Sequence, residues 1–181
     1  QFLPIGIIGY SFATAAMPSF AKSVSSEKSK RFGEQLTKTV RMVLFFVVPA
    51  SILMFVLRAH IVRLVFGSGA FSWDDTRLTA AVLGIFAFGI FAHSLIPLLS
   101  RAFYAMQNTK TPVIINSIGF FINIVLSFFF VFVLFKNPKV SSFISEFPDM
   151  GGIDNIVLLG LPLAFSLAGI LNLAIFFYPL K

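Results

Sequence analysis

The sequence contains no cysteine and few charged residues. Only 12% of its 181 residues are Asp, Glu, Lys or Arg, whereas a soluble domain averages about 25%. The absence of cysteine excludes disulfides and thiolate metal sites. Among the charged residues, the seven acidic ones are half as many as the 14 basic ones, and the formal net charge is +7. Because 57% of the chain is hydrophobic, we expect the basic residues to mark cytoplasmic loops and anionic membrane lipids, with no nucleic-acid partner.

Long apolar runs take the place of the missing charges. Leu78–Leu99 and Val113–Phe135 contain no Asp, Glu, Lys or Arg. Each is long enough to cross a bilayer, which takes about 20 residues. The residues between them carry Arg101 and Lys110 and end on Pro112. We therefore predict a short basic hairpin between two membrane helices, with Pro112 at the first position of the second helix.

The whole chain divides into five such segments, none of which contains Asp or Glu. Their approximate bounds are 2–21, 40–57, 78–99, 113–135 and 156–180. Residues 22–39 are predicted to form a cytoplasmic amphipathic connector, because Phe32, Leu36 and Val40 recur at helical spacing. The predicted fold is an all-α polytopic transmembrane helix bundle of about five spans, in one domain covering residues 1–181.

Prolines and small residues are expected to shape these helices. Pro18 should bend or end the first span, and Pro162 and Asn172 should interrupt the fifth. Gly6, Gly9 and Ala13 share one face of the first span, which favours close approach of a neighbouring helix.

The basic residues also predict an orientation. Residues 22–41 carry six of them, and the hairpin and the last residue add three, whereas five lie on the other side. The positive-inside rule places the nine in the cytoplasm. We expect Lys30, Arg31, Arg101 and Lys110 to contact anionic lipid headgroups there. On the other side, Ser72 is expected to cap the third helix.

Polar residues inside the apolar segments are the candidates for a functional site. At 100° per residue, Asn116, Gly119, Asn123 and Ser127 fall in an arc of about 80° on one face of the fourth span. We expect this face to point to the protein interior, since unpaired amides are costly in hydrocarbon. Two interpretations remain open for it and for His93: a seam of hydrogen bonds between helices, or a cavity lining that contacts a cation or a transported headgroup.

Several short motifs occur in a specific order along the chain. They are residues 1–9 (QFLPIGIIG), 63–71 (RLVFGSGAF), 75–78 (DTRL), 100–105 (SRAFYA) and 109–112 (TKTP). Together they resemble the MurJ/MviN family, the lipid II flippases of the multidrug/oligosaccharidyl-lipid/polysaccharide exporter superfamily. The resemblance runs with consistent spacing from Gln1 to about Ser127.

The resemblance implies a two-lobe carrier without catalytic residues, metal or cofactor. Such carriers move the undecaprenyl-pyrophosphate-linked peptidoglycan precursor across the bacterial cytoplasmic membrane by alternating access, for cell-wall synthesis. The chain would be an internal fragment of the second lobe, and the N-terminal lobe would be its missing partner. Members often carry an acid at the position of Ser127, so a monovalent cation would be held more weakly near Asn123 and Ser127 than by a carboxylate.

Three other functions stay open on the sequence. Another polysaccharide-lipid or multidrug exporter of the same superfamily is the first. A membrane-embedded transferase is the second, although it would need paired carboxylates or a His–acid pair near the bilayer. A structural membrane scaffold is the third, and the polar residues within the spans speak against it.

Overall fold

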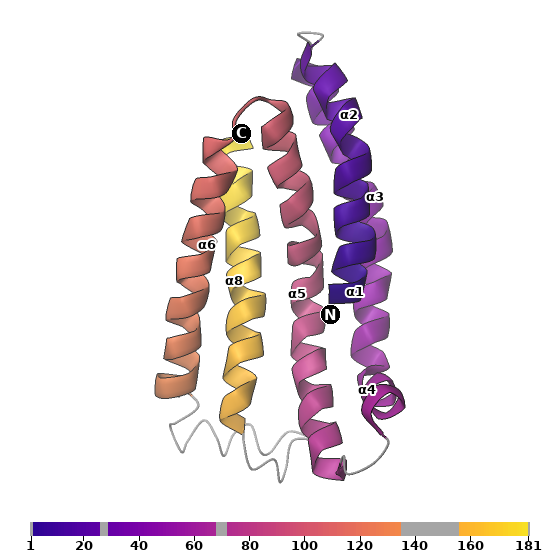
Figure 1. Cartoon of the computed structure of the whole chain (residues 1–181), viewed down its shortest axis with the longest axis vertical. Helices are drawn as coiled ribbons and strands as arrows, with labels where there is room; N and C mark the ends of the chain where they lie inside the picture. Colours follow the sequence, from indigo (N-terminus) through magenta and orange to yellow (C-terminus); the bar gives the residue numbers. More distant parts are fainter. Residues whose placement is uncertain (1, 26–28, 68–71, 135–155, 181) are drawn as a thin grey trace.

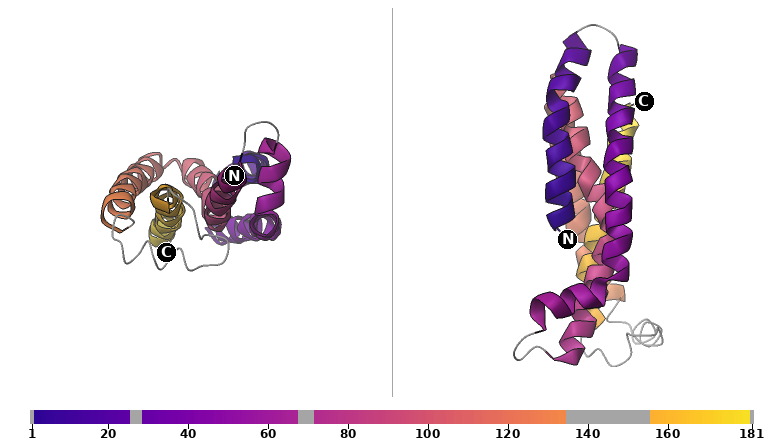
Figure 2. Two further views of the ribbon diagram at one scale, coloured as in Figure 1. Left: turned by 90° about the horizontal axis from the view of Figure 1, so that it is seen from below. Right: turned by 90° about the vertical axis from the view of Figure 1, so that its right-hand side faces the viewer.

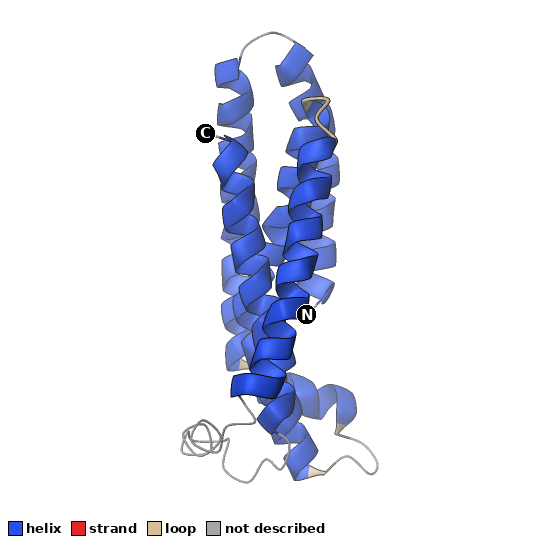
Figure 3. Ribbon diagram, turned by 90° about the vertical axis from the view of Figure 1, so that its left-hand side faces the viewer, coloured by secondary structure: helices blue, strands red, loops and turns tan. Residues whose placement is uncertain are grey.

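The computed structural model describes residues 2–25, 29–67, 72–134 and 156–180. Within these residues all regular elements are helices, and no strand occurs (Figure 3). The predicted all-α helix bundle is therefore confirmed. The glycines at positions 67 and 69 predict a tight loop over residues 66–71, which lies largely outside the described residues. The connection at 136–155, between the fourth and fifth predicted spans, lies outside them too.

The N-terminal helical run is continuous but changes type along its length. Residues Phe2–Pro4 (α1), the π-helical Ile5–Tyr10 (η1) and Ser11–Ser25 (α2) follow one another without a break. Pro18 lies inside α2 and does not end it. Of the two predicted effects of Pro18, a bend or an end, the end is wrong, because the helix continues to Ser25. Beyond Pro18, the Phe20 side chain is buried, with its ring centroid 5.7 Å from that of Phe32.

The second helix, α3 (Ser29–Val56), returns along the first. Its amphipathic first turns pack Phe32, Leu36 and Val40 against the core, as their spacing predicts. After a turn at Leu57 the short helix α4 (Arg58–Phe66) changes direction and crosses the end of the bundle (Figure 2).

The longest helix, α5 (Trp73–Ala105), lies at the centre of the molecule (Figure 1). The predicted cap is present: the Asp75 backbone N–H donates to the Ser72 hydroxyl, and the Ser72 N–H donates to the Asp75 carboxylate. At about 1.5 Å per residue, 33 residues extend about 50 Å, well beyond the ~30 Å hydrocarbon layer.

The connection after α5 is much shorter than the predicted hairpin. It consists of the four residues from Met106 to Thr109, because α5 runs through Arg101 and α6 already starts at Lys110. Pro112 is thus the third residue of α6, still in the first turn, where its missing N–H breaks no helical bond. Backbone N–H groups of residues 107 and 108 return to the carbonyls of residues 104 and 103, closing the turn.

Two helices complete the fold. The first is α6 (Lys110–Phe128), which continues as the π-helical η2 (Phe129–Leu134). The second is α8 (Gly160–Phe177), flanked by 3-10 turns at Ile156–Leu159 (η3) and Tyr178–Leu180 (η4). The expected interruption at Pro162 and Asn172 is absent: Pro162 lies in the first turn of α8, where proline is tolerated, and α8 continues through Asn172.

The helices pack around α5 in two groups. Seen end-on, α2 and α3 lie on one side of α5, and α6 and α8 on the other (Figure 2). The close contact of the first group uses Gly9: a Cβ there would lie 3.0 Å from the Ser94 backbone, and Ala13 is buried beside it. Gly6 does not take part in this face, since no atom lies within 4 Å of its added Cβ.

Four helices are long and apolar enough to cross a membrane. They comprise residues Arg31–Val56, Trp73–Ala105, Lys110–Phe132 and Gly160–Phe177. The N-terminal run of residues 2–25, predicted as the first of the five spans, is not among them. Their outward surfaces carry many exposed phenylalanines and leucines, which suits a bundle surrounded by lipid.

Candidate functional site

The polar face of α6 lies against α8. Asn172 of α8 donates from its amide Nδ2 to Oδ1 of Asn116, at 3.4 Å. The two helices approach closely there because Gly119 has no side chain: a Cβ would lie 2.5 Å from Nδ2 of Asn172. Oδ1 of Asn172 is buried and has no hydrogen-bond partner among the residues that the structure describes.

One turn further on, Asn123 and Ser127 bond to each other. The Ser127 hydroxyl donates to Oδ1 of Asn123 at 3.4 Å, within α6. Both side chains are partly buried. On the opposite face Phe121 and Val125 are each 65% exposed. The polar arc therefore faces the protein and the apolar arc faces outward, as the helical spacing predicts.

His93 of α5 also bonds to α8. Its Nε2 lies 3.3 Å from the carbonyl oxygen of Phe165, and its ring stacks on the Phe165 ring at 4.2 Å between centroids. The imidazole lies directly on the backbone of Gly169, which leaves no room for a side chain there. Of the two interpretations, contact with a neighbouring helix describes His93 in this structure.

The four candidates thus do not meet in one cavity. His93 of α5 bonds to a backbone carbonyl of α8, and Asn116 of α6 bonds to the side chain of Asn172 in α8. Asn123 and Ser127 bond within α6. Three clefts formed by the described residues are all lined by other side chains. The arrangement supports a seam of polar contacts more directly than a shared ligand site.

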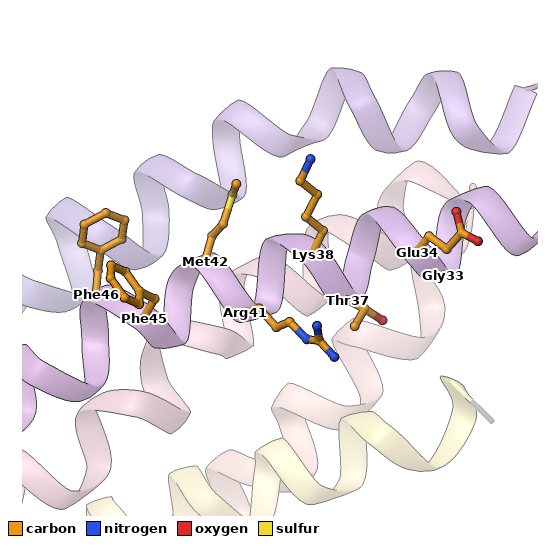
Figure 4. Close-up of a pocket in the computed structure, with 8 residues that line it drawn as sticks. All are labelled: Gly33, Glu34, Thr37, Lys38, Arg41, Met42, Phe45 and Phe46. Atoms are coloured by element: carbon orange, nitrogen blue, oxygen red, sulfur yellow. The ribbon is translucent and has the colours of Figure 1, made fainter.

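One cleft is an open groove along a single helix, α3. Its volume is about 1060 Å³, and its lining changes character along the helix (Figure 4). Glu34, Lys38 and Arg41 line the part near the start of α3, whereas Phe45 and Phe46 line the part deeper in the apolar segment. Figure 4 shows that the side chains of Lys38 and Arg41 leave α3 in different directions. Such a groove suits an amphipathic ligand with an anionic head.

The basic residues predicted to contact headgroups lie at this same end of the molecule. Arg31 is exposed near the start of α3, and Lys110 is exposed at the start of α6. Arg101 is half-buried near the end of α5. Figure 1 shows the starts of α3 and α6 and the end of α5 at one end of the bundle. Lys30 lies in α3, but its side chain is outside the described part of the chain.

Comparison with known proteins decides the family. The family described as lipid II flippase MurJ matches residues 1–181. The chain belongs to the lipid II flippase MurJ family. It is 32% identical over 125 residues to a probable lipid II flippase MurJ of Rhizobium tropici, and 34% identical over 130 residues to one of Thermotoga maritima. These matches cover 69% and 70% of this chain, but 24% and 26% of the relatives.

A solved structure of a MurJ protein agrees with this assignment. The lipid II flippase MurJ in its inward closed conformation matches with a TM-score of 0.75 and 26% sequence identity. The match covers 99% of this chain and 33% of that chain. The chain is therefore a membrane protein of the MurJ family that spans about a quarter to a third of the length of these relatives.

Three residues of these sites were not predicted as candidates. The sequence counts Lys38 and Arg41 only toward the orientation. Both line the groove on α3, although their side chains leave the helix in different directions (Figure 4). Asn172 had been interpreted only as a helix interruption. A second asparagine within another apolar segment was the available signal that Asn116 has a polar partner.

Proposed function

We propose that this MurJ-family chain is part of a carrier that moves lipid II across the bacterial cytoplasmic membrane. The observation that carries the proposal is the family match along the whole chain. The lipid-linked peptidoglycan precursor is then the substrate, and transport proceeds by alternating access between two lobes. The relatives are named as flippases, and we assign this chain a transport role without catalysis. The remainder of the carrier would supply the other lobe.

The groove along α3 supports a role in handling the substrate. Lys38 and Arg41 are cations at the end where the headgroup of a membrane lipid would lie, and guanidinium groups bind phosphate oxygens through paired donors. Phe45 and Phe46 continue the groove toward the hydrocarbon, where a polyprenyl chain would lie. We assign this end of the bundle to the cytoplasm, in accordance with the positive-inside rule.

A monovalent cation near Asn123 and Ser127 remains part of the proposal. The amide oxygen of Asn123 and the hydroxyl oxygen of Ser127 lie 3.4 Å apart on the face of α6 that points to the protein. Both are neutral oxygen donors. Replacing Ser127 by Asp would add a charged ligand. We expect the transport rate of the S127D carrier to depend more strongly on the concentration of the monovalent cation.

The test of the proposal is a chimera. This chain replaces the corresponding segment of the lipid II flippase of Thermosipho africanus, and the chimera is expressed in a bacterium depleted of its own flippase. We expect growth to be restored. The double substitution Lys38→Gln and Arg41→Gln should reduce rescue, whereas Arg63→Gln on the exposed α4, at the opposite end, should not. A well-expressed chimera that never rescues growth would contradict the proposal.

Another exporter of the same superfamily is the alternative function. Such an exporter differs from a lipid II carrier only in the molecule that it transports. A chimera that transports a different polysaccharide-linked lipid in vesicles, and does not transport lipid II, would favour it.

A further inference from the structure

A second cleft lies at the end of the bundle opposite the groove with Lys38 and Arg41. It has a volume of about 630 Å³ and is bounded by α4 and by the start of α5. Arg58, His60 and Arg77 line it together with Trp73. Neither Asp74 nor Asp75 lines it, and the Asp75 carboxylate accepts hydrogen bonds from Ser72. The lining of this cleft is therefore cationic.

The cleft lies at the level expected for the boundary between hydrocarbon and water. The apolar stretch of α3 ends at Val56, directly before Arg58. The Trp73 ring lies under the guanidinium of Arg63, at 5.0 Å. Tryptophan and arginine with this placement are typical of the membrane interface, where lipid phosphates lie.

An apolar groove continues from this cleft toward the middle of the membrane. It runs between α3 and α5, has a volume of about 260 Å³, and is lined by Val48, Ile52, Ala87, Phe88 and Phe91, among others. Val48 and Ile52 are one helical turn apart. The groove therefore runs along the helix axes, in the direction of a lipid acyl chain.

One residue joins the two spaces. Phe55 lines both the cationic cleft and the apolar groove. The guanidinium of Arg58 lies 4.8 Å from the Phe55 ring, and the Arg58 stem packs beside Gly84, where a Cβ would lie 3.0 Å from its Cδ. Arg58 is thus held in place at the point where cleft and groove meet.

We propose that the cleft and the groove together bind one anionic phospholipid from the leaflet at the α4 end. The phosphate lies among Arg58, His60 and Arg77, and one acyl chain lies along Ile52 and Phe88. Charge complementarity selects an anionic headgroup over a zwitterionic one. This site uses none of the residues assigned to the transported substrate, and it does not depend on which leaflet faces the cytoplasm.

Native mass spectrometry of the full-length carrier tests the proposal. The detergent-solubilised protein is titrated with phosphatidylglycerol and, separately, with phosphatidylcholine. We expect one phosphatidylglycerol to be retained more tightly than phosphatidylcholine. Arg58→Gln should weaken phosphatidylglycerol retention about five-fold, the effect of losing one cation near an anionic lipid. Lys22→Gln, in the last turn of α2 at the other end of the bundle, should leave the retention of this lipid unchanged.

The groove has its own matched pair of variants. Ile52→Trp fills the groove and should reduce retention of the lipid. Leu53→Trp adds the same side chain at a neighbouring residue that is also exposed but does not line the groove, and it should have no effect. The melting temperature of each variant shows whether it remains folded, and a misfolded Ile52→Trp is replaced by Val48→Phe.

Three results would overturn the proposal. The first is equal retention of the two lipids. The second is unchanged phosphatidylglycerol retention in both Arg58→Gln and the folded groove variant. The third is a structure of the full-length carrier in which another part of the protein fills the cleft. If a polyprenyl pyrophosphate alone binds at Arg58, the site belongs to the substrate, and the phospholipid proposal fails while the carrier function stands.

Discussion

Individual polar side chains in this bundle have partners on helices that are distant in the sequence. Asn116 bonds to Asn172, and His93 bonds to the carbonyl of Phe165. Ser166 donates to the carbonyl of Ile85 at 3.1 Å. In a hydrocarbon environment such bonds contribute about 0.6 kcal/mol each on average, so close packing has to supply much of the stability.

The contact of Gly119 with Asn172 leads to the first prediction. Gly119→Ala places a methyl group against the Asn172 amide and should destabilise the protein by about 1–3 kcal/mol through overpacking. Gly6→Ala is the control, since it gains the same helix propensity at a position with open space around it. Thermal unfolding in detergent measures both. Equal melting temperatures would show that α6 and α8 can separate without cost.

The turn between α5 and α6 leads to the second prediction. Gln107 has φ = 60°, the left-handed region that costs a residue with a side chain about 1–2 kcal/mol. Gln107→Gly relieves this strain, and we expect the melting temperature to rise. Gln107→Ala keeps a Cβ and should bring no such gain. If the alanine and glycine variants have the same stability, the turn is not strained in solution.

At the scale of the element, α6 shows how one helix separates protein from lipid. Asn116 and Gly119 contact Asn172 of α8, whereas Phe120, Phe121 and Phe128 are exposed. Helical spacing alone predicts this division, because residues three and four apart share a face. Spacing cannot show which helix the polar face of α6 meets. The packed structure shows that Asn116 and Gly119 on this face meet α8.

The outward face of α6 leads to the third prediction. Val125 lies well inside the apolar segment, so Val125→Asp should raise the free energy of membrane insertion by about 2.5–3.5 kcal/mol. Thr109→Asp adds the same charge in the exposed turn before α6 and should insert normally. A glycosylation-based insertion assay distinguishes the two. Normal insertion of the Val125→Asp helix would mean that this face is in contact with protein or water.

At the scale of the whole molecule, the bundle has two chemically different ends. The starts of α3 and α6 lie at one end with most of the basic residues, and α4 with the start of α5 lies at the other (Figure 1). This arrangement agrees with the sidedness predicted from the loops. The orientation itself, with the basic end in the cytoplasm, remains a prediction.

Labelling of single cysteines tests that orientation, which is the fourth prediction. The chain has no cysteine, so Gly33→Cys, Asn108→Cys and Ser72→Cys each introduce a unique thiol at an exposed position. In intact cells a membrane-impermeant maleimide should label only Ser72→Cys. After permeabilisation it should label all three. Labelling of Gly33→Cys and Asn108→Cys from outside would reverse the orientation, and labelling of only one of these two would contradict the bundle.

The sequence by itself determined the class of protein and the approximate positions of four membrane-spanning helices. Uncharged runs of about 20 residues have one stable solution in a bilayer, a helix that satisfies its own backbone hydrogen bonds. The cap at Ser72, the amphipathic start of α3 and the two faces of α6 follow from local spacing in the same way. The family also followed from short motifs in order.

Only the tertiary structure decided what the polar residues do and where clefts occur. The sequence predicts that Pro18 bends or ends its helix and that Asn172 interrupts one, yet α2 continues through Pro18 and α8 through Asn172, which is the partner of Asn116. Sequence spacing could not show that the cationic cleft and the apolar groove meet at Phe55, or that together they combine residues of α3, α4 and α5. The physical reason is that lipid tails are as apolar as the helix faces, so hydrophobicity does not determine which helices pack together. Small residues that allow close packing and a few hydrogen bonds between helices determine the neighbours, and these contacts exist only once the helices lie side by side.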